Sequence, residues 1–358
     1  GIAPFNFPAM IPMGWMMPLC IATGNTLVLR PSPVTPMTSI RMTELLHEAG
    51  LPEGVVNLVT CGPSGAESLV AHPDVRGLMF VGSTRVGQNV YANAARHGKR
   101  VQALCQAKNH ALVMEDAPIE RTARGIINGA FGCAGERCMA LPVVAAHECI
   151  ADELVACLVR LARERKLGPG YDKTSELGPL VTAQHRKSVT DWIQRGIDEG
   201  AVLALDGRAA VVEGYENGFF LGPCIFDHVK PGMSIGEQEI FGPVLSVKRV
   251  KSFEEGLHLI NSNPYANGAV IFTQNGFYSR EFARRSHAGM VGINVGIPVP
   301  VSVFPFSGHK QSFFGDLHAM GRDGVRFFTQ VKSVTATWFD EEEIRREKID
   351  TWDGMLGR

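Results

Sequence analysis

The chain has 358 residues, of which 45% are hydrophobic and 20% charged, and its 35 basic residues nearly balance 36 acidic ones. This length is enough for two or three domains with a buried core. The charge balance argues against binding of nucleic acid or of a membrane surface through a basic patch. No segment has the roughly 18 consecutive apolar residues of a membrane span, and no secretory signal is visible. We therefore expect a cytoplasmic protein, or a mitochondrial matrix protein if the source is eukaryotic.

The cysteines and histidines exclude two further classes of site. The 8 cysteines are too dilute for a disulfide framework and include no CxxC pair, which fits a reducing compartment. The 11 histidines form no ligand-spaced cluster with cysteines or carboxylates, so no metal site is predicted.

Strand and helix patterns alternate along the chain, which predicts an α/β fold with a largely parallel sheet. The predicted order begins with strand 26–29, helix 37–49, strand 55–59, strand 78–81, helix 85–96, strand 101–104, strand 111–114 and helix 118–131. It continues with helix 151–165, helix 183–199, strand 219–226, strand 244–250, helix 253–260, strand 268–272 and strand 290–294. The highly charged segment 340–348 is expected to be a solvated tail.

A candidate phosphate site lies in LMFVGSTRVG at 78–87, where a buried strand runs through Gly82 and Ser83 into a helix. The start of such a helix presents unpaired N–H groups and the positive end of the helix dipole, which suits a phosphate or pyrophosphate. The alternative is an ordinary capped helix after a strand, and this segment alone does not separate the two.

A candidate nucleophile is Cys138, in the small-residue segment GCAGERCMA at 132–140. A substrate can approach such a segment closely, and the charge of the adjacent Arg137 would favour the reactive thiolate. The alternative is that the cysteine is a small buried hydrophobic residue, which Cys133 fits well.

Two polar side chains are candidates for binding. Asn6 lies in PFNFP, whose rigid flanks would hold its amide as a fixed donor for an oxyanion; the alternative is a plain turn asparagine. A carboxylate in EQEIFGPV at 237–244 would suit ribose hydroxyls, and a solvated surface loop is the alternative.

PFNFP, LRPSP at 29–33, VGSTRVG, the cysteine motif and EIFGPV stand in the order found in the aldehyde dehydrogenase superfamily, which the chain resembles over residues 1–338. Three segments are similar to the CoA-acylating methylmalonate/malonate semialdehyde dehydrogenases: AKNHALVMEDA at 107–117, GERCMAL at 135–141 and FPFSGHKQSFFGDLHAMGRDGVRFFTQVKSVT at 304–335. The resemblance implies an aldehyde dehydrogenase-like α/β fold with a Rossmann-like cofactor domain, an α/β catalytic domain and a C-terminal oligomerisation strand.

The resemblance also implies roles for single residues. Cys138 would attack the aldehyde, and Asn6 with the backbone N–H of Cys138 would stabilise the oxyanion. Hydride transfer to NAD would leave a thioester on Cys138. The implied cofactor residues are Ala3 and Phe5 through their backbone, Arg30 at the adenine ribose, Ser83 at the pyrophosphate, Cys105 through its backbone at the nicotinamide amide, Glu239 at the nicotinamide ribose and Phe241 beside the nicotinamide. Pro33 replaces a glutamate of the family that would repel a 2′-phosphate, which weakens the support for NAD over NADP.

Leu104 stands where hydrolytic aldehyde dehydrogenases have a glutamate that activates the deacylating water. Leucine cannot take a proton, whereas a CoA thiol is partly ionised near neutral pH and needs less help from a base. We therefore expect an acyl-CoA product. The alternative is that another base serves, in a CoA-independent hydrolytic aldehyde dehydrogenase.

Arg137 is the candidate for binding a substrate carboxylate, because its planar guanidinium matches a carboxylate; it could instead tie the catalytic loop to a neighbour. The expected reaction is the oxidation of malonate or methylmalonate semialdehyde with NAD and CoA, with decarboxylation to acetyl-CoA or propionyl-CoA. The alternative from another class is a non-catalytic dehydrogenase-like subunit.

The expected domains are an NAD-binding domain at 1–105, a catalytic domain at 106–303, a return segment with an oligomerisation strand at 304–338, and a charged tail at 339–358. Segment 331–337 is the strand expected to pair with a neighbouring subunit, and the family implies a homo-oligomer, either a dimer or a tetramer. Because the family is longer on the N-terminal side, the first elements of the cofactor domain are expected before residue 1.

Overall fold

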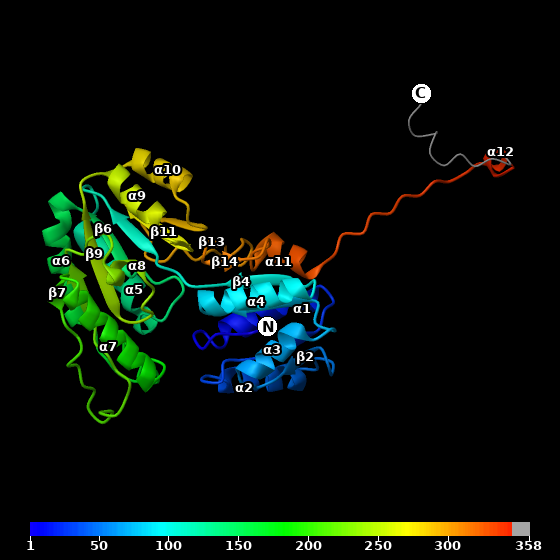
Figure 1. The fold of residues 1–358 in the computed structure, drawn as a ribbon, viewed down its shortest axis with the longest axis horizontal. Helices are drawn as coiled ribbons and strands as arrows, with labels where there is room; N and C mark the ends of the chain where they lie inside the picture. The colour runs from blue at the N-terminus through cyan, green and yellow to red at the C-terminus, as the bar shows by residue number, and fades with distance from the viewer. Residues whose placement is uncertain (346–358) are drawn as a thin grey trace. The chain divides into compact units, whose positions relative to one another are not determined.

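The computed structural model describes residues 1–345, which fall into a large unit, residues 1–328, and a second unit that begins at Thr329. Within residues 1–345, the strands form a seven-stranded sheet, a three-stranded sheet and two two-stranded sheets, all inside the large unit (Figure 1).

The seven-stranded sheet organises the region that contains Cys138. Its order is β12 (Met290–Ile293), β11 (Gly268–Phe272), β5 (His110–Val113), β6 (Val143–His147), β9 (Val244–Val250), β8 (Cys224–Asp227) and β7 (Val202–Leu205). Neighbouring strands are parallel except for the antiparallel pair β7–β8. Every residue of β5, β8 and β11 is buried, as is typical of strands with both faces of the sheet covered.

Helices cover both faces of this sheet. On one face, α5 (Ile119–Phe131), α6 (Glu148–Arg163) and α7 (Ala183–Asp198) pack into one hydrophobic core, which Ala111 and Val113 of β5 join. The intervening Leu112 belongs to a second core with α9 (Phe253–Ser262) and α10 (Gly276–Arg285). Because successive strand residues point to opposite faces, these two cores lie on opposite sides of the sheet.

The N-terminal region contains two smaller sheets. β1 (Leu27–Leu29) pairs with β2 (Val56–Leu58), and β3 (Gly77–Val81) pairs with β4 (Arg100–Leu104), all in parallel. Ile2 forms bridges with both Arg30 and Phe80, so the N-terminal segment joins the two sheets. The helices of this region are η1 (Met10–Met16), α1 (Met17–Ala22), α2 (Met37–Glu48), α3 (Pro63–Ala71), α4 (Thr84–Arg96) and α11 (Gly321–Phe328).

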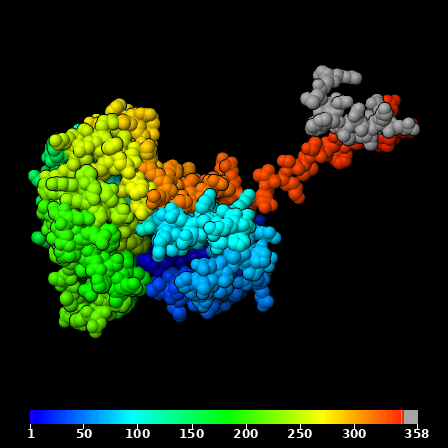
Figure 2. Space-filling model, in the orientation of Figure 1, coloured from blue at the N-terminus to red at the C-terminus, as the bar shows by residue number. Residues whose placement is uncertain are grey.

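Short elements connect the two regions. β14 (Phe313–Phe314) returns antiparallel onto β4, and β10 (Tyr265–Ala266) pairs with β13 (His309–Lys310). The remaining elements are η2 (Gly132–Gly135), α8 (Ser234–Glu237) and α12 (Glu341–Ile344). Figure 2 shows the N-terminal residues, in dark blue, in the hollow between the green and the cyan surfaces.

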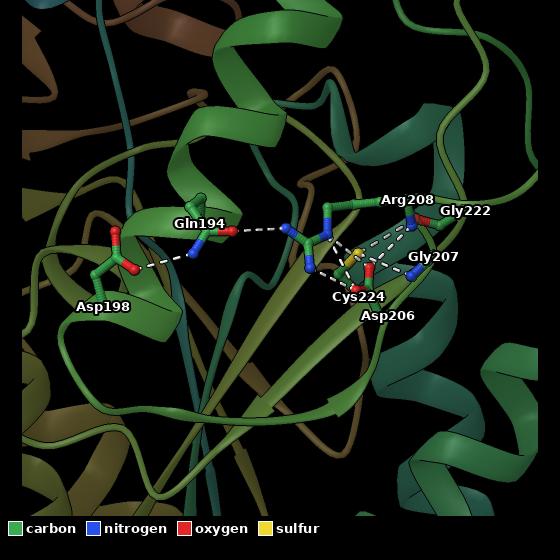
Figure 3. Close-up of polar contacts among 7 residues, drawn as sticks. All are labelled: Gln194, Asp198, Asp206, Gly207, Arg208, Gly222 and Cys224. Carbon is green, nitrogen blue, oxygen red and sulfur yellow. Dashed lines mark hydrogen bonds and ion pairs between the residues drawn. The ribbon is translucent and has the colours of Figure 1, made fainter.

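Arg208 ties the edge of the large sheet to α7 (Figure 3). Its guanidinium contacts the Asp206 carboxylate with two nitrogens, at 2.9 and 2.6 Å, and donates to Gln194 Oε1 at 3.0 Å. The buried thiol of Cys224 accepts from the Gly207 N–H, and burial raises its pKa to about 12. Cys224 is therefore an inert structural thiol, as expected of most cysteines in this chain.

Most predicted elements are present, but the predicted strand 219–226 is wrong in its first half. Only Cys224–Asp227 pairs, because Pro223 has no N–H to donate and Gly222 is pressed against the Gly207 backbone. The sequence prediction also misses β6, a central strand, because the alanines of VVAAH are not typical strand residues.

Residues 331–337, predicted to form an oligomerisation strand, belong to no helix or strand in this single chain, and the pairing with a neighbouring subunit stays a prediction. Most of the charged tail predicted at 339–358 lies outside the described residues. The predicted boundary at 105–106 separates β4 from β5, which belong to different sheets, and the domain assignment also stays a prediction. Within residues 1–345 no helix has the length and apolar character to cross a membrane.

The start of α9 offers a test of local stability. The Ser252 hydroxyl accepts the Glu255 N–H at 3.2 Å, and the Glu255 carboxylate in turn accepts the Lys251 N–H at 2.7 Å. We expect Ser252→Ala to lower the free energy of unfolding by about 1 kcal/mol, because an N-terminal N–H loses its acceptor. Urea denaturation measures this loss.

The matched control is Ser262→Ala at the other end of α9, whose hydroxyl donates to the i−4 carbonyl of His258 at 2.7 Å. Neither this bond nor the long 3.4 Å contact of the same hydroxyl with the His258 ring caps the helix, so the control should change stability by less than about 0.5 kcal/mol. Equal losses in the two variants would contradict the capping role of Ser252.

Candidate active site

Cys138 follows a tightly turned loop. In η2, Cys133 and Ala134 have φ values of 51° and 54°, and Gly135 follows at +73°. A Cβ on Gly135 would lie 2.1 Å from the Gly242 carbonyl oxygen, so only glycine fits there. We call residues 132–138 the nucleophile loop and residues 239–243 the facing loop. Direct backbone contact between these loops sets where Cys138 lies.

Two asparagine side chains hold the backbone of Cys138. The buried Asn109 amide donates to the Cys138 carbonyl at 2.9 Å and to the Ala140 carbonyl at 2.8 Å, and its oxygen accepts the Gly268 N–H at 2.8 Å. Asn267 donates to the same Cys138 carbonyl at 3.2 Å. Our residue-level reasoning from the sequence assigned neither a role, although Asn109 lies in the AKNH segment of the resemblance.

Asn6 comes to Cys138 from the other end of the chain. Its Nδ2 donates to the Glu136 carbonyl at 3.1 Å and lies 3.9 Å from the Cys138 Sγ. The structure thus brings together the predicted nucleophile and the predicted oxyanion donor. When the sulfur adds to an aldehyde, the oxyanion that forms beside it would lie within reach of this amide. The geometry is therefore compatible with the predicted role.

The surroundings of Cys138 disfavour the ionised form of its thiol. Burial, and then the negative charge of Glu239, raise the pKa of Cys138 to about 11, while the hydrogen bond from Asn6 opposes them. Arg137 is not among the groups that set this pKa, so the expectation that it favours the thiolate finds no support here.

Arg137 is packed against its own loop. A Cβ on Gly132 would lie 2.4–2.5 Å from the guanidinium atoms, so the guanidinium lies directly over this glycine. Nη1 donates to the Asn128 carbonyl at 3.4 Å, and the buried Nε has no hydrogen-bond partner. The observed contacts match the structural alternative, in which Arg137 ties the loop to α5, and its substrate-binding role stays a prediction.

The predicted nicotinamide residues lie beside Cys138. The rings of Phe5 and Phe241 pack edge to face with 5.8 Å between centroids. Glu239 accepts the Ala107 N–H at 2.9 Å and a side-chain hydrogen bond from Gln106, yet burial dominates and raises its pKa to about 7. One pocket is lined by Asn109, Cys138, Glu239 and Phe241 together with eight neighbouring residues of these segments.

The predicted pyrophosphate site is the start of α4. Ser83 is exposed at the N-cap of this 13-residue helix, and its hydroxyl makes no capping bond. A Cβ on Gly82 would lie 2.6 Å from the Phe80 ring, so the backbone there must stay uncovered. The first N–H, that of Thr84, donates to Gln106 Oε1 at 3.1 Å. Gln106 therefore links this helix start to Glu239, a connection that our sequence reasoning missed.

The other predicted cofactor residues lie at three places in the N-terminal region. Ala3 and Arg30 are joined through their backbones at 3.0 Å, and the Arg30 side chain donates twice to the Cys61 carbonyl. The Phe5 carbonyl accepts the Thr35 hydroxyl, and Pro33 is exposed close to it in sequence. Cys105 is buried, its N–H donates to the Ser312 carbonyl at 2.8 Å, and burial raises the pKa of its thiol to about 12.

The wall near the sulfur is apolar. Leu104, at the end of β4, is buried in a core whose border includes Phe7, Trp15 and Ile297 as well as Cys138. Leu104 pairs with Phe313 of β14 and cannot exchange a proton. Among residues 1–345, no three His, Cys, Asp or Glu side chains gather so as to hold a metal ion.

The environment of Cys138 predicts its reactivity. In the ligand-free protein, alkylation of Cys138 by iodoacetamide should increase with pH and level off only near pH 11. Glu239→Gln should move this profile to lower pH, because it removes a negative charge that disfavours the thiolate. Peptide mass spectrometry follows Cys138, with the exposed Cys133 as an internal reference. A wild-type profile centred below about pH 8 would contradict the described environment.

The Asn109 contacts predict a coupled loss of stability and activity. Asn109→Ala leaves the Ala140 carbonyl and the Gly268 N–H without this partner, so the free energy of unfolding should fall by about 2–3 kcal/mol. Turnover should fall as well, because the Cys138 backbone is less fixed. The control, Asn57→Ala, removes an exposed bond to Gly54 and should be within about 0.5 kcal/mol of wild type. An unchanged stability for the Asn109 variant would refute the anchoring role.

The comparisons with known proteins agree with this geometry. Residues 1–334 match the sequence profile of the aldehyde dehydrogenase family. A malonate-semialdehyde dehydrogenase of Geobacillus thermodenitrificans is 52% identical over 339 residues, which is 94% of this chain and 69% of that protein.

Two solved structures share the fold. One, assigned as a methylmalonate-semialdehyde dehydrogenase of Sinorhizobium meliloti and solved with NAD, has a TM-score of 0.93 at 44% identity, over 95% of this chain and 69% of that one. The other, a methylmalonate-semialdehyde dehydrogenase of Oceanimonas doudoroffii, has a TM-score of 0.94 at 44% identity, over 97% of this chain and 71% of that one. The chain has the aldehyde dehydrogenase-like α/β fold predicted from the sequence, and it belongs to the aldehyde dehydrogenase family.

Proposed function

We propose that the chain catalyses the NAD-dependent, CoA-acylating oxidation of malonate or methylmalonate semialdehyde. For the smaller substrate, malonate semialdehyde, NAD and CoA give acetyl-CoA, carbon dioxide and NADH. The names of the Geobacillus, Sinorhizobium and Oceanimonas relatives support this substrate class. Methylmalonate semialdehyde would give propionyl-CoA in the same way.

The first half of the reaction uses Cys138 and Asn6. The Cys138 sulfur adds to the aldehyde carbon, its proton leaves to solvent, and the Asn6 amide, 3.9 Å from the sulfur, donates to the oxygen that becomes negative. NAD, when bound, accepts the hydride of the resulting thiohemiacetal. The N-terminus of α4, where the exposed Ser83 hydroxyl makes no capping bond, suits its pyrophosphate, and the carboxylate of Glu239 suits its ribose. The product of this half is a thioester on Cys138.

The observation that carries the CoA assignment is the apolar surrounding of Leu104. A thioester is hydrolysed efficiently only where a base takes a proton from water, and leucine at this position offers none. The carboxyl closest in sequence to Cys138, that of Glu136, is turned toward the Val181 N–H and His185. A thiolate of CoA needs no such base, so it displaces the Cys138 thiolate from the acyl group, and the sulfur of Cys138 then takes up a proton. The carboxylate of the acyl group leaves as carbon dioxide, and a proton from solvent takes its place on the carbon.

The substrate carboxylate requires a positive partner, and we propose Arg137 for it. Arg137 lines the pocket that contains Cys138, and its guanidinium makes a single long hydrogen bond, 3.4 Å to Asn128, that a substrate carboxylate could replace. The fork of arginine matches a carboxylate better than a point charge does. We further propose a cytoplasmic homo-oligomer, a dimer or a tetramer, in which segment 331–337 pairs with a neighbouring subunit.

The product identifies the reaction. With malonate semialdehyde and NAD, we expect sustained NADH formation only when CoA is present, with acetyl-CoA as the product in mass spectrometry. Sustained NADH formation with a free acid and no CoA would place the protein among the hydrolytic enzymes. An absence of NADH under both conditions, with NAD still bound, would favour a non-catalytic subunit.

Cys138→Ala should abolish NADH formation and leave NAD binding intact, because only the sulfur is removed. Cys149→Ala, at an exposed thiol on α6, is the matched control and should retain turnover. Turnover that survives in the Cys138 variant would refute the thioester mechanism.

A further inference from the structure

A carboxyl and an imidazole meet between the nucleophile loop and the facing loop. Glu136 is 7% exposed, and its Oε1 accepts the Val181 N–H at 3.2 Å and lies 3.5 Å from the His185 Nε2. The same Nε2 is 2.7 Å from the Phe241 carbonyl. Because a carbonyl can only accept, His185 Nε2 carries the proton and donates it there.

Hydrogen bonds fix the backbone of both Glu136 and His185. Glu136 precedes Cys138 by two positions, and its own carbonyl accepts the Asn6 amide at 3.1 Å. His185 is in the first turn of α7, where its backbone N–H donates to the capping hydroxyl of Thr182 at 3.1 Å. One contact therefore joins the Cys138 backbone, the oxyanion donor and the start of a 16-residue helix.

The strained backbone of the facing loop has to be stabilised by contacts from outside the loop. Phe241 has φ of 58°, a conformation that costs a non-glycine residue free energy unless the surroundings impose it. A Cβ on the following Gly242 would lie 2.7 Å from the Val189 side chain, so α7 leaves the loop no space on that side. The hydrogen bond from His185 is the side-chain contact that fixes the strained carbonyl.

The neighbouring charges do not compete for this contact. The Arg137 guanidinium lies on Gly132 and Asn128, and the Glu239 carboxylate accepts the Ala107 N–H. Burial raises the pKa of Glu136 to about 7, and the bond from Val181 opposes this rise. The His185 Nε2, 3.5 Å from Oε1, is the side-chain nitrogen that lies beside this carboxyl.

We propose that Glu136 and His185 are a positioning pair that holds Phe241 and the nucleophile loop in register for hydride transfer. Neither side chain is assigned a contact with substrate: His185 acts through the Phe241 carbonyl, and Glu136 acts through His185. This inference rests on the proposed function, in which Phe241 lies beside the nicotinamide and Cys138 attacks the aldehyde.

The test compares deletion of each side chain with its conservative replacement. His185→Ala should weaken NAD binding and lower kcat, each by about tenfold, which corresponds to the loss of one hydrogen bond to a buried carbonyl. The KM for the aldehyde should change less than threefold. His185→Gln should stay within about threefold of wild type in all three quantities, because a glutamine amide can donate to the same carbonyl.

The acidic partner is tested in the same way. Glu136→Ala should resemble His185→Ala, and Glu136→Gln should retain most NAD affinity because its oxygen still accepts from Val181 and still lies against the His185 ring. The double alanine variant should be no weaker than His185→Ala, since both changes remove one unit. Gln184→Ala, at the exposed neighbour of His185 on α7, is the control and should leave NAD affinity unchanged.

Full NAD affinity in His185→Ala would overturn the proposal, and so would a loss in His185→Gln equal to that in His185→Ala. Additive losses in the double variant would separate Glu136 from His185 and also contradict it. Circular dichroism and thermal unfolding confirm that each variant is folded. NAD affinity, measured by titration calorimetry without aldehyde, stays informative if the proposed semialdehyde is not a substrate, so the two failures can be told apart.

Discussion

The hydrogen bonds to the backbone of the nucleophile loop are the constraint on which the site depends. Asn109 and Asn267 fix the Cys138 carbonyl, and Asn6 binds the Glu136 carbonyl. These three amides come from segments far apart in the chain, so the position of the sulfur is set by the tertiary fold. Such fixed donors need no rearrangement when negative charge develops, which is why a carboxamide next to a sulfur is well suited to acyl chemistry.

The same packing explains why the resting thiol is protected. Burial and Glu239 keep Cys138 in its neutral form, so reagents that attack thiolates find little to react with. The Glu239 carboxylate is held by Ala107 and Gln106, and Gln106 also accepts from the start of α4. The groups proposed to bind the ribose and the pyrophosphate are therefore linked through hydrogen bonds of the Gln106 side chain in the ligand-free protein.

The sequence reasoning located the reacting atoms better than their orientation. Cys138 and Asn6 were paired through the resemblance, and the structure brings them within 3.9 Å. The orientation of the Arg137 side chain, over Gly132 and toward the Asn128 carbonyl, could not be predicted, because it depends on contacts that leave no trace in local sequence. Asn109 and His185 were not predicted for a related reason. Their roles depend on hydrogen-bond partners that are distant in sequence and that only the fold brings close. Likewise, alternation of strand and helix predicted most of the sheet, while the half-strand at 219–223 required knowledge of the Gly207 contact.

The central claim is that the Cys138 thioester persists until a CoA thiol takes the acyl group. Stopped-flow measurement of NADH with malonate semialdehyde and NAD, in the absence of CoA, tests it most directly. The account predicts a burst of about one NADH per active site followed by a near-complete stop, with intact-protein mass spectrometry locating an acyl group on Cys138. Addition of CoA should restart NADH formation and remove the adduct. Linear NADH formation without a burst, and without an adduct on Cys138, would contradict the account.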